Sequence, residues 1–197
     1  MVSRVASSGG PSDAELLARV AGGDAGAFGP IVERYQDRLY NAVYRLVGSH
    51  EDARDLVQDS FVKAFEHLDG FHGTSSLYTW LFRIAVNTSL SHRRKRKWVQ
   101  APALGSSDGD EASVADPPDP SSPDPAGAAL AAEKEAIVQR ALSSLDDEHR
   151  TVIVLRDIQH CDYHEIGEIL DLPPGTVKSR LHRARLMLRE KLEPLLK

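Results

Sequence analysis

The chain is poor in cysteine and has no long apolar run. Cys161 is the only cysteine among 197 residues, so no disulfide can form within the chain, which is typical of a reducing compartment. No apolar run approaches the roughly 20 residues needed to cross a bilayer, and residues 1–11 lack the apolar centre of a signal peptide. The sequence therefore predicts a soluble, cytoplasmic protein without a membrane span.

Patterns that are typical of enzymes and metal sites are also scarce. The chain has no glycine loop of the kind that cradles phosphate, and no clear set of nucleophile, base and acid. His160, Cys161 and His164 lie close together, with His149 further back, but their spacing matches no structural zinc pattern. We expect no catalytic site, no cofactor and no metal. A zinc enzyme or sensor is the weakest alternative, because a lone thiol is more often simply packed.

Positive charge is low on average but strongly segregated. The net charge is -5, whereas residues 93–97 are five consecutive cations and residues 178–191 carry six more. Residues 108–124 hold six acidic residues and no Lys or Arg. Because the local field rather than the net charge decides where a polyanion docks, nucleic-acid binding remains open.

Caps and apolar stripes predict an all-α fold of two small helical domains. Residues 1–11, rich in Ser and Gly, are predicted to be a disordered tail. The first domain spans 12–98, and its helices are expected to start at the following caps: Ser12, Asp24, Ser49, and Ser75 or Ser76. Residues 99–128 mix Pro with Ser, Gly and Asp, which predicts a flexible acidic Pro-rich linker. The second domain spans 129–197, with caps at Asp146 and Asp162.

The sequence at the end of the second domain predicts a helix-turn-helix. Residues 173–175, Pro-Pro-Gly, break one helix, and Pro is tolerated in the first turn of the next. Apolar residues then recur at helical spacing, while Lys178, Ser179, His182 and Arg183 fall on the other faces. A helix with one apolar seam and one cationic, hydrogen-bonding face suits a DNA major groove. The alternative is a surface helix whose cations are merely solvated, but such a face normally mixes charges of both signs.

Two further surfaces in the first domain are ambiguous from spacing alone. The third helix carries Asp52, Asp55, Gln58 and Asp59 on its non-core side, which favours a solvated acidic face over a docking face. The fourth helix leads from Asn87 into the cations at 93–97, a pattern that suits a helix lying along DNA. The loop before it carries Phe71 and His72, which either pack or hold an unpaired base.

Taken together, three stretches resemble the extracytoplasmic-function (ECF, group IV, sigma-E-like) sigma factors of bacterial RNA polymerase. Residues 52–61, DARDLVQDSF, resemble family region 2.2, and residues 78–88, YTWLFRIAVNT, resemble regions 2.3 and 2.4. Residues 165–167, EIG, and 175–185, GTVKSRLHRAR, resemble region 4.2. The likeness spans roughly residues 24–97 and 130–196, in the family's order and spacing.

The resemblance implies a function and particular partners. It implies a non-enzymatic subunit that binds core RNA polymerase, at the beta-prime clamp helices and the beta subunit, and directs it to promoter DNA, under control of an anti-sigma factor. The implied polymerase-binding residues are Asp52, Asp55, Gln58 and Asp59. The implied minus-ten residues are Phe71, His72, Ser75, Ser76, Asn87, Arg93 and Arg94. The implied minus-thirty-five residues are Thr176, Lys178, Ser179, Arg180, His182 and Arg183.

The chain also departs from the family pattern. Many members have an acidic residue near Ser91, and its absence here leaves the role of the end of the fourth helix open. The residue at the position of His182 varies among members, so the promoter sequence stays open. The alternative function is a two-domain regulator of another class, which would bind duplex DNA alone, as a dimer on paired half-sites.

Overall fold

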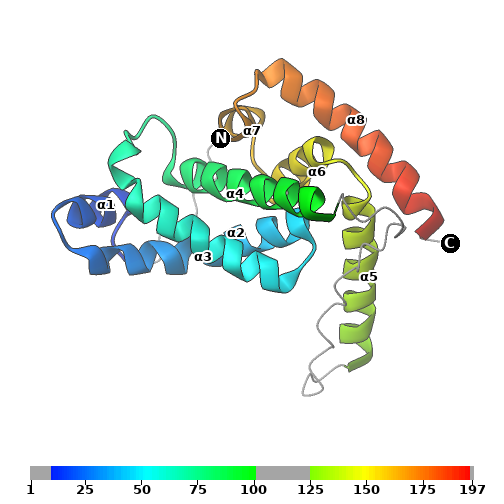
Figure 1. The fold of residues 1–197 in the computed structure, drawn as a ribbon, viewed down its shortest axis with the longest axis horizontal. Coiled ribbons are helices and arrows are strands. Elements are labelled where there is room, and N and C mark those ends of the chain that lie inside the picture. The colour runs from blue at the N-terminus through cyan, green and yellow to red at the C-terminus, as the bar shows by residue number, and fades with distance from the viewer. Residues whose placement is uncertain (1–9, 101–124, 196–197) are drawn as a thin grey trace.

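The computed structural model describes residues 10–100 and 125–195, and every regular element in these ranges is helical (Figure 1). The N-terminal domain, residues 10–100, contains α1 (Asp13–Ala21), the 3-10 turn η1 (Ala25–Phe28), α2 (Gly29–Val47), α3 (His50–Glu66), the 3-10 turn η2 (Leu68–Gly70) and α4 (Leu77–Gln100). The C-terminal domain, residues 125–195, contains α5 (Pro125–Ser143), α6 (Asp147–Ile153), the π turn η3 (Val154–Ile158), α7 (Tyr163–Leu170), α8 (Pro174–Leu192) and the 3-10 turn η4 (Glu193–Leu195). The predicted all-α class is confirmed.

Local hydrogen bonds define most helix ends where the sequence predicts them. Ser12 and Asp162 each form a capping box, in which the cap side chain and the residue three positions later exchange hydrogen bonds. Ser49 accepts the backbone N–H of Asp52 at 3.2 Å, and Ser76 accepts that of Thr79 at 3.0 Å, so Ser76 rather than Ser75 caps α4. Gly48 ends α2 with φ 80°, a left-handed conformation that glycine adopts without steric cost.

The prediction that Asp24 caps the second helix is wrong. Asp24 precedes the short turn η1 and makes no side-chain cap, because its carboxylate is paired with Arg19 at 2.7 Å. Helix α2 begins at Gly29 instead, with Pro30 in its first turn. Proline fits there because the first backbone N–H groups of a helix have no intrahelical partner.

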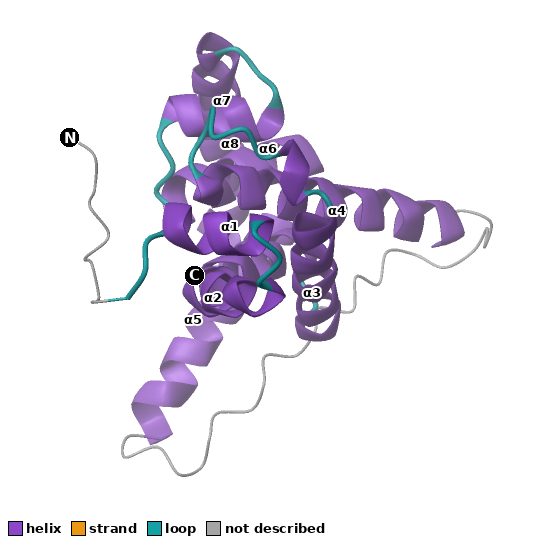
Figure 2. Cartoon of the chain, turned by 90° about the vertical axis from the view of Figure 1, so that its left-hand side faces the viewer, coloured by secondary structure: helices purple, strands orange, loops and turns teal. Residues whose placement is uncertain are grey.

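Both ends of the predicted linker belong to helices. Helix α4 continues to Gln100 and α5 begins at Pro125, so residues 99–100 and 125–128 extend the helices on either side. The remaining linker residues, 101–124, and residues 1–9 of the predicted tail lie outside the described part of the chain. In Figure 2 the last turns of α4 project from the helical bundle, and α5 projects in another direction.

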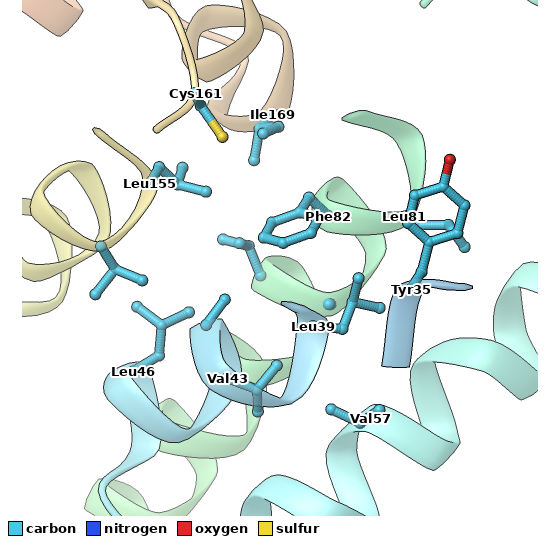
Figure 3. Close-up of a cluster of buried hydrophobic side chains, with 14 of the residues drawn as sticks. Tyr35, Leu39, Val43, Leu46, Val57, Leu81, Phe82, Leu155, Cys161 and Ile169 are labelled. Carbon is cyan, nitrogen blue, oxygen red and sulfur yellow. The ribbon is translucent and has the colours of Figure 1, made fainter. Parts of the chain in front are cut away.

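The two domains share one apolar core. Leu39, Val43 and Leu46 of α2 and Phe82 of α4 are buried together with residues of the C-terminal domain, namely Leu155, Cys161 and Ile169 (Figure 3). Helix α4 packs against α7, and α2 packs against α5, α6 and η3. Within the described ranges, no helix is long and apolar enough to cross a membrane.

Arg150 of α6 is the most buried charged side chain of the described residues and connects both domains. Its side chain is 1% exposed, and its guanidinium donates to the carbonyl oxygens of Leu142 at 2.7 Å, Ser143 at 2.6 Å and Leu145 at 2.7 Å. A fourth hydrogen bond, of 2.8 Å, reaches the carbonyl oxygen of Leu46 in the last turn of α2. The last carbonyl oxygens of a helix have no donor within that helix. The guanidinium of Arg150 donates hydrogen bonds to such oxygens at the ends of both α5 and α2.

Cys161 lies at the boundary between the domains. It is 1% exposed, and its Sγ is 3.4 Å from the hydroxyl oxygen of Tyr78 in α4. Burial raises the pKa of the Cys161 thiol to about 11, although the hydrogen bond from Tyr78 acts in the opposite direction. Within the described ranges, no group of three or more His, Cys, Asp and Glu side chains could hold a metal ion. This geometry is that of a packed thiol.

Replacing Arg150 tests the role of its guanidinium in stability. We expect Arg150→Ala to lower the free energy of unfolding by about 3 kcal/mol, because buried carbonyl oxygens lose their donors. Urea denaturation followed by circular dichroism measures the change. Arg140→Ala, on the exposed side of α5, is the matched control and should change stability by less than about 0.5 kcal/mol. Equal stability of the two variants would contradict the assignment.

The reactivity of Cys161 tests its burial. At pH 8 a thiol with a pKa of about 11 contains about a hundredfold less thiolate than one with the ordinary value of 9.0. We therefore expect Ellman's reagent to react with the native protein at least about a hundredfold more slowly than with the urea-unfolded chain. The raised pKa also means that the stability contributed by the protonated thiol is complete below pH 9.0 and lost as pH rises through about 11. Rapid native labelling at pH 8 would rule out the buried position.

Candidate functional site

The turn between α7 and α8 fixes the geometry of the helix-turn-helix. Asp171 ends α7 in a left-handed conformation, φ 54°, and α8 begins three residues later at Pro174. Gly167 of α7 lies directly beneath the turn, where a Cβ atom would stand 2.7 Å from the carbonyl oxygen of Leu172. Only glycine permits this approach, so the angle between the two helices is set by backbone contact.

Helix α8 presents one exposed polar face, which we call the recognition face. Val177, Leu181 and Ala184 are buried against the domain. The recognition face consists of residues that are all exposed: Lys178, Ser179, His182 and Arg183. It therefore exposes two cationic and two hydrogen-bonding side chains, a combination that suits the major groove of DNA.

Two residues of the predicted minus-thirty-five set lie beside this face rather than on it. Arg180 is half-buried and its guanidinium is 3.1 Å from a carboxylate oxygen of Glu148 in α6. Thr176 is also half-buried, and its carbonyl oxygen accepts the Ser179 hydroxyl at 3.0 Å. Arg180 therefore connects α8 to α6 in this conformation, while the recognition face remains exposed.

Helix α4 carries a second exposed polar stripe, which we call the α4 face. Arg83, Asn87, Ser91 and Arg94 are all exposed and are separated by three or four residues. Residues at this spacing lie on one side of a helix. Arg83 is not among the residues predicted from the sequence, although its position four residues before Asn87 is a sufficient signal.

Arg93 does not lie on the α4 face. Its Nε is 2.7 Å from a carboxylate oxygen of Asp147 in α6, and it donates to the carbonyl oxygen of Leu46 at 3.0 Å. Lys97, four residues later, reaches the other oxygen of Asp147 at 3.2 Å. Burial raises the pKa of Asp147, but Arg93 and Lys97 outweigh this effect and the net shift is downward. In this conformation Arg93 therefore joins the two domains, and its contact with minus-ten DNA stays a prediction.

The loop before α4 brings together the other predicted minus-ten residues. The ring of Phe71 is half-buried and packs on Trp80, with centroids 5.3 Å apart, whereas His72 is exposed. Ser76 is exposed and its hydroxyl is 2.8 Å from that of Thr79, and Ser75 is half-buried. Phe71 therefore anchors the loop against Trp80, while His72 and Ser76 face solvent.

Helix α3 carries the predicted acidic surface. Asp55, Gln58 and Asp59 are exposed, but Asp52 is paired with Arg96 of α4 at 3.1 Å. Gln58 borders an apolar groove of about 1010 Å³ between α2 and α3. The apolar side chains that line the groove include Val32, Val57, Phe61, Val62 and Phe65. Two of them, Val62 and Phe65, are markedly exposed. Asp37, Arg54 and Glu66 also line this groove, which is therefore suited to a helix with apolar and charged side chains.

The chain is similar to known proteins over both domains. The chain matches the family model described as Sigma-70 region 2 over residues 31–99 and that described as Sigma-70, region 4 over residues 135–188. It is 37% identical to the ECF RNA polymerase sigma factor SigW of Bacillus subtilis over 184 residues, covering 91% of this chain and 96% of that protein. It is 38% identical to the ECF RNA polymerase sigma-E factor of Escherichia coli K12 over 190 residues, covering 94% and 97%.

A solved structure is similar over most of the chain. The sigma factor RpoE in complex with the anti-sigma factor NepR from Bartonella quintana superposes with a TM-score of 0.66 and 30% identity, covering 84% of this chain and 96% of that one. The sequence matches extend through both domains, and the exposed faces of α4 and α8 lie within the two matched regions. The chain therefore belongs to the sigma-70 family and, within it, to the ECF sigma factors of RNA polymerase.

Proposed function

We propose that this chain binds core RNA polymerase and directs it to specific promoters. The observation that carries this proposal is the presence of two separate exposed DNA-type faces, on α4 and on α8, in one chain that also exposes an apolar groove bordered by carboxylates. The chain contributes specificity, and the chemistry of nucleotide addition belongs to the core enzyme. A chain that acts on promoter DNA in this way acts in the cytoplasm, where bacterial DNA lies.

The recognition face reads the minus-thirty-five element. Lys178 and Arg183 are exposed cations that can donate to guanine in the major groove, and Ser179 and His182 add donors and acceptors between them. A good bidentate contact contributes about 1–3 kcal/mol of discrimination between bases. Thr176 and Arg180 support this contact from the side of the helix.

The α4 face and the loop before it recognise the minus-ten element. Asn87 can read a base edge, Arg94 can neutralise a phosphate toward the end of α4, and the loop holding His72 and Ser76 precedes the start of the same helix. A base captured by this loop must leave the stack at a cost of a few kcal/mol, so its capture favours the melted promoter. Arg93 joins this surface once it separates from Asp147.

The acidic surface of α3 and the neighbouring groove bind the polymerase. Asp55 and Asp59 supply negative charge, and Gln58 borders the apolar groove. We assign this surface to the clamp helices of the beta-prime subunit, with the beta subunit contacting other parts of the chain. Asp52 is paired with Arg96, so it contributes by holding α4 against α3.

An anti-sigma factor controls the chain in this proposal. The similar RpoE structure is a complex with such an inhibitor. Here the two domains are packed together through Arg93, Arg150 and the shared core, so one inhibitor can contact both at once. An inhibitor that binds this closed form would keep Arg93 away from DNA.

Run-off transcription with purified core polymerase and a pool of promoter fragments tests the function. We expect selective initiation that depends on this chain, and about a tenfold or greater loss of selective initiation with Lys178→Ala or Arg183→Ala. Arg189→Ala, exposed further along α8, is the control and should retain activity. Binding to core polymerase should be unchanged in all three. Initiation without the chain, or equal use of all promoters by the variants, would refute the assignment.

Titration of core polymerase tests the docking surface. We expect Asp55→Ala and Asp59→Ala each to weaken the affinity about fivefold at low salt, with a smaller difference at high salt, because exposed charges are screened. Glu190→Ala, an exposed carboxylate on α8, is the control. Affinities that match wild type at low salt would exclude the acidic surface from the interface.

A further inference from the structure

Trp98 is the most exposed large apolar residue of the described chain. It lies in the last turns of α4 and is 84% exposed, whereas Trp80 in the first turn of the same helix is 8% exposed. The last turns of α4 project from the helical bundle (Figure 2). A fully exposed tryptophan side chain often marks a binding surface, because its indole gains both apolar contact and a hydrogen bond when a partner binds.

The register of α4 places Trp98 on the α4 face. Asn87, Ser91, Arg94 and Trp98 follow one another at spacings of three or four residues, and all are exposed. At 3.6 residues per turn, the eleven residues from Asn87 to Trp98 return to within about 20° of the same direction and advance about 16 Å along the axis. Trp98 therefore continues the proposed DNA-binding stripe by one turn beyond Arg94.

The cationic residues around Trp98 fall into two groups, those paired with a carboxylate and those that are not. Arg93 and Lys97 are held by Asp147 on one side, and Arg96 is held by Asp52 on another. Arg94 and Lys95 are exposed, and neither has a carboxylate partner among residues 10–100 and 125–195. Arg94 and Lys95 are thus available to a polyanion, and they lie four and three residues before Trp98, on the same side of the helix.

We propose that Trp98 packs against the sugar-phosphate backbone of the duplex that adjoins the minus-ten element on its upstream side. Arg94 and Lys95 neutralise the flanking phosphates, and the indole N–H donates to a phosphate oxygen. This inference rests on the proposed function. The partner is DNA rather than an apolar protein surface because open cations flank the indole. It is upstream duplex because the base-capturing loop lies at the opposite end of α4.

The stability of the open complex tests the proposal with full-length protein in holoenzyme. On a promoter with intact upstream duplex, we expect Trp98→Ala to shorten the lifetime about fivefold or more, the low end of the effect of removing an aromatic contact to nucleic acid. On a matched fragment whose duplex ends at the upstream edge of the minus-ten element, the variant and wild type should have equal lifetimes. Trp98→Tyr should recover most of the lifetime.

The salt dependence of DNA affinity distinguishes the contribution of the indole from that of the neighbouring cations. Arg94→Ala should reduce the slope of log affinity against log salt by about 1 because one phosphate contact is lost, and Trp98→Ala should leave the slope unchanged. Val99→Ala, which removes a side chain that is 72% exposed and points elsewhere on the helix, is the matched control and should behave as wild type.

Three results would overturn the proposal. They are an unchanged lifetime for Trp98→Ala, an equal loss on the truncated fragment, and a loss of affinity for core polymerase, which would assign Trp98 to a protein partner. Failure of the proposed function is distinct, because the wild-type chain would then support no selective initiation on any fragment.

Discussion

The arrangement of the two domains depends on the guanidinium of Arg150. Helices α2 and α5 end close together, and the guanidinium donates to a carbonyl oxygen in the last turn of each, at Leu46 and Leu142. Arginine is suited to this position because its planar group carries five donors and stays charged at any pH that proteins survive. The shared core around Phe82 and Leu155 forms on either side of this polar centre.

The closed packing determines which functional groups are available. Asp147 follows the cap of α6 and adjoins Arg150 in space, with 3.8 Å between charged atoms, so one short segment both joins the domains and holds Arg93 and Lys97. The recognition face of α8 and the α4 face remain exposed in the same conformation. Domain packing therefore engages part of the basic run at 93–97 in ion pairs and leaves the two faces that we propose to contact bases exposed.

Local features were predictable from the sequence, and long-range ones were not. The caps at Ser12, Ser49 and Asp162 follow from hydrogen bonds within three residues, and the apolar stripe of α8 follows from helical spacing. Asp24 failed as a cap because Arg19 competes for its carboxylate. The family resemblance assigned Arg93 and Arg180 to DNA, and sequence spacing could not show that Asp147 and Glu148 lie opposite them in this conformation. Of the candidate site, the exposed faces were predictable and the ion pairs between helices were not.

The backbone contact between Gly167 and Leu172 has a consequence for how such a chain can diversify. The two helices of the helix-turn-helix are locked by atoms that no side-chain exchange on α8 alters, and the recognition face points away from them. Positions 178, 179, 182 and 183 can therefore change while the angle at which α8 meets DNA stays fixed. A lineage carrying this turn can acquire new promoter preferences by a few surface substitutions, without passing through misfolded intermediates.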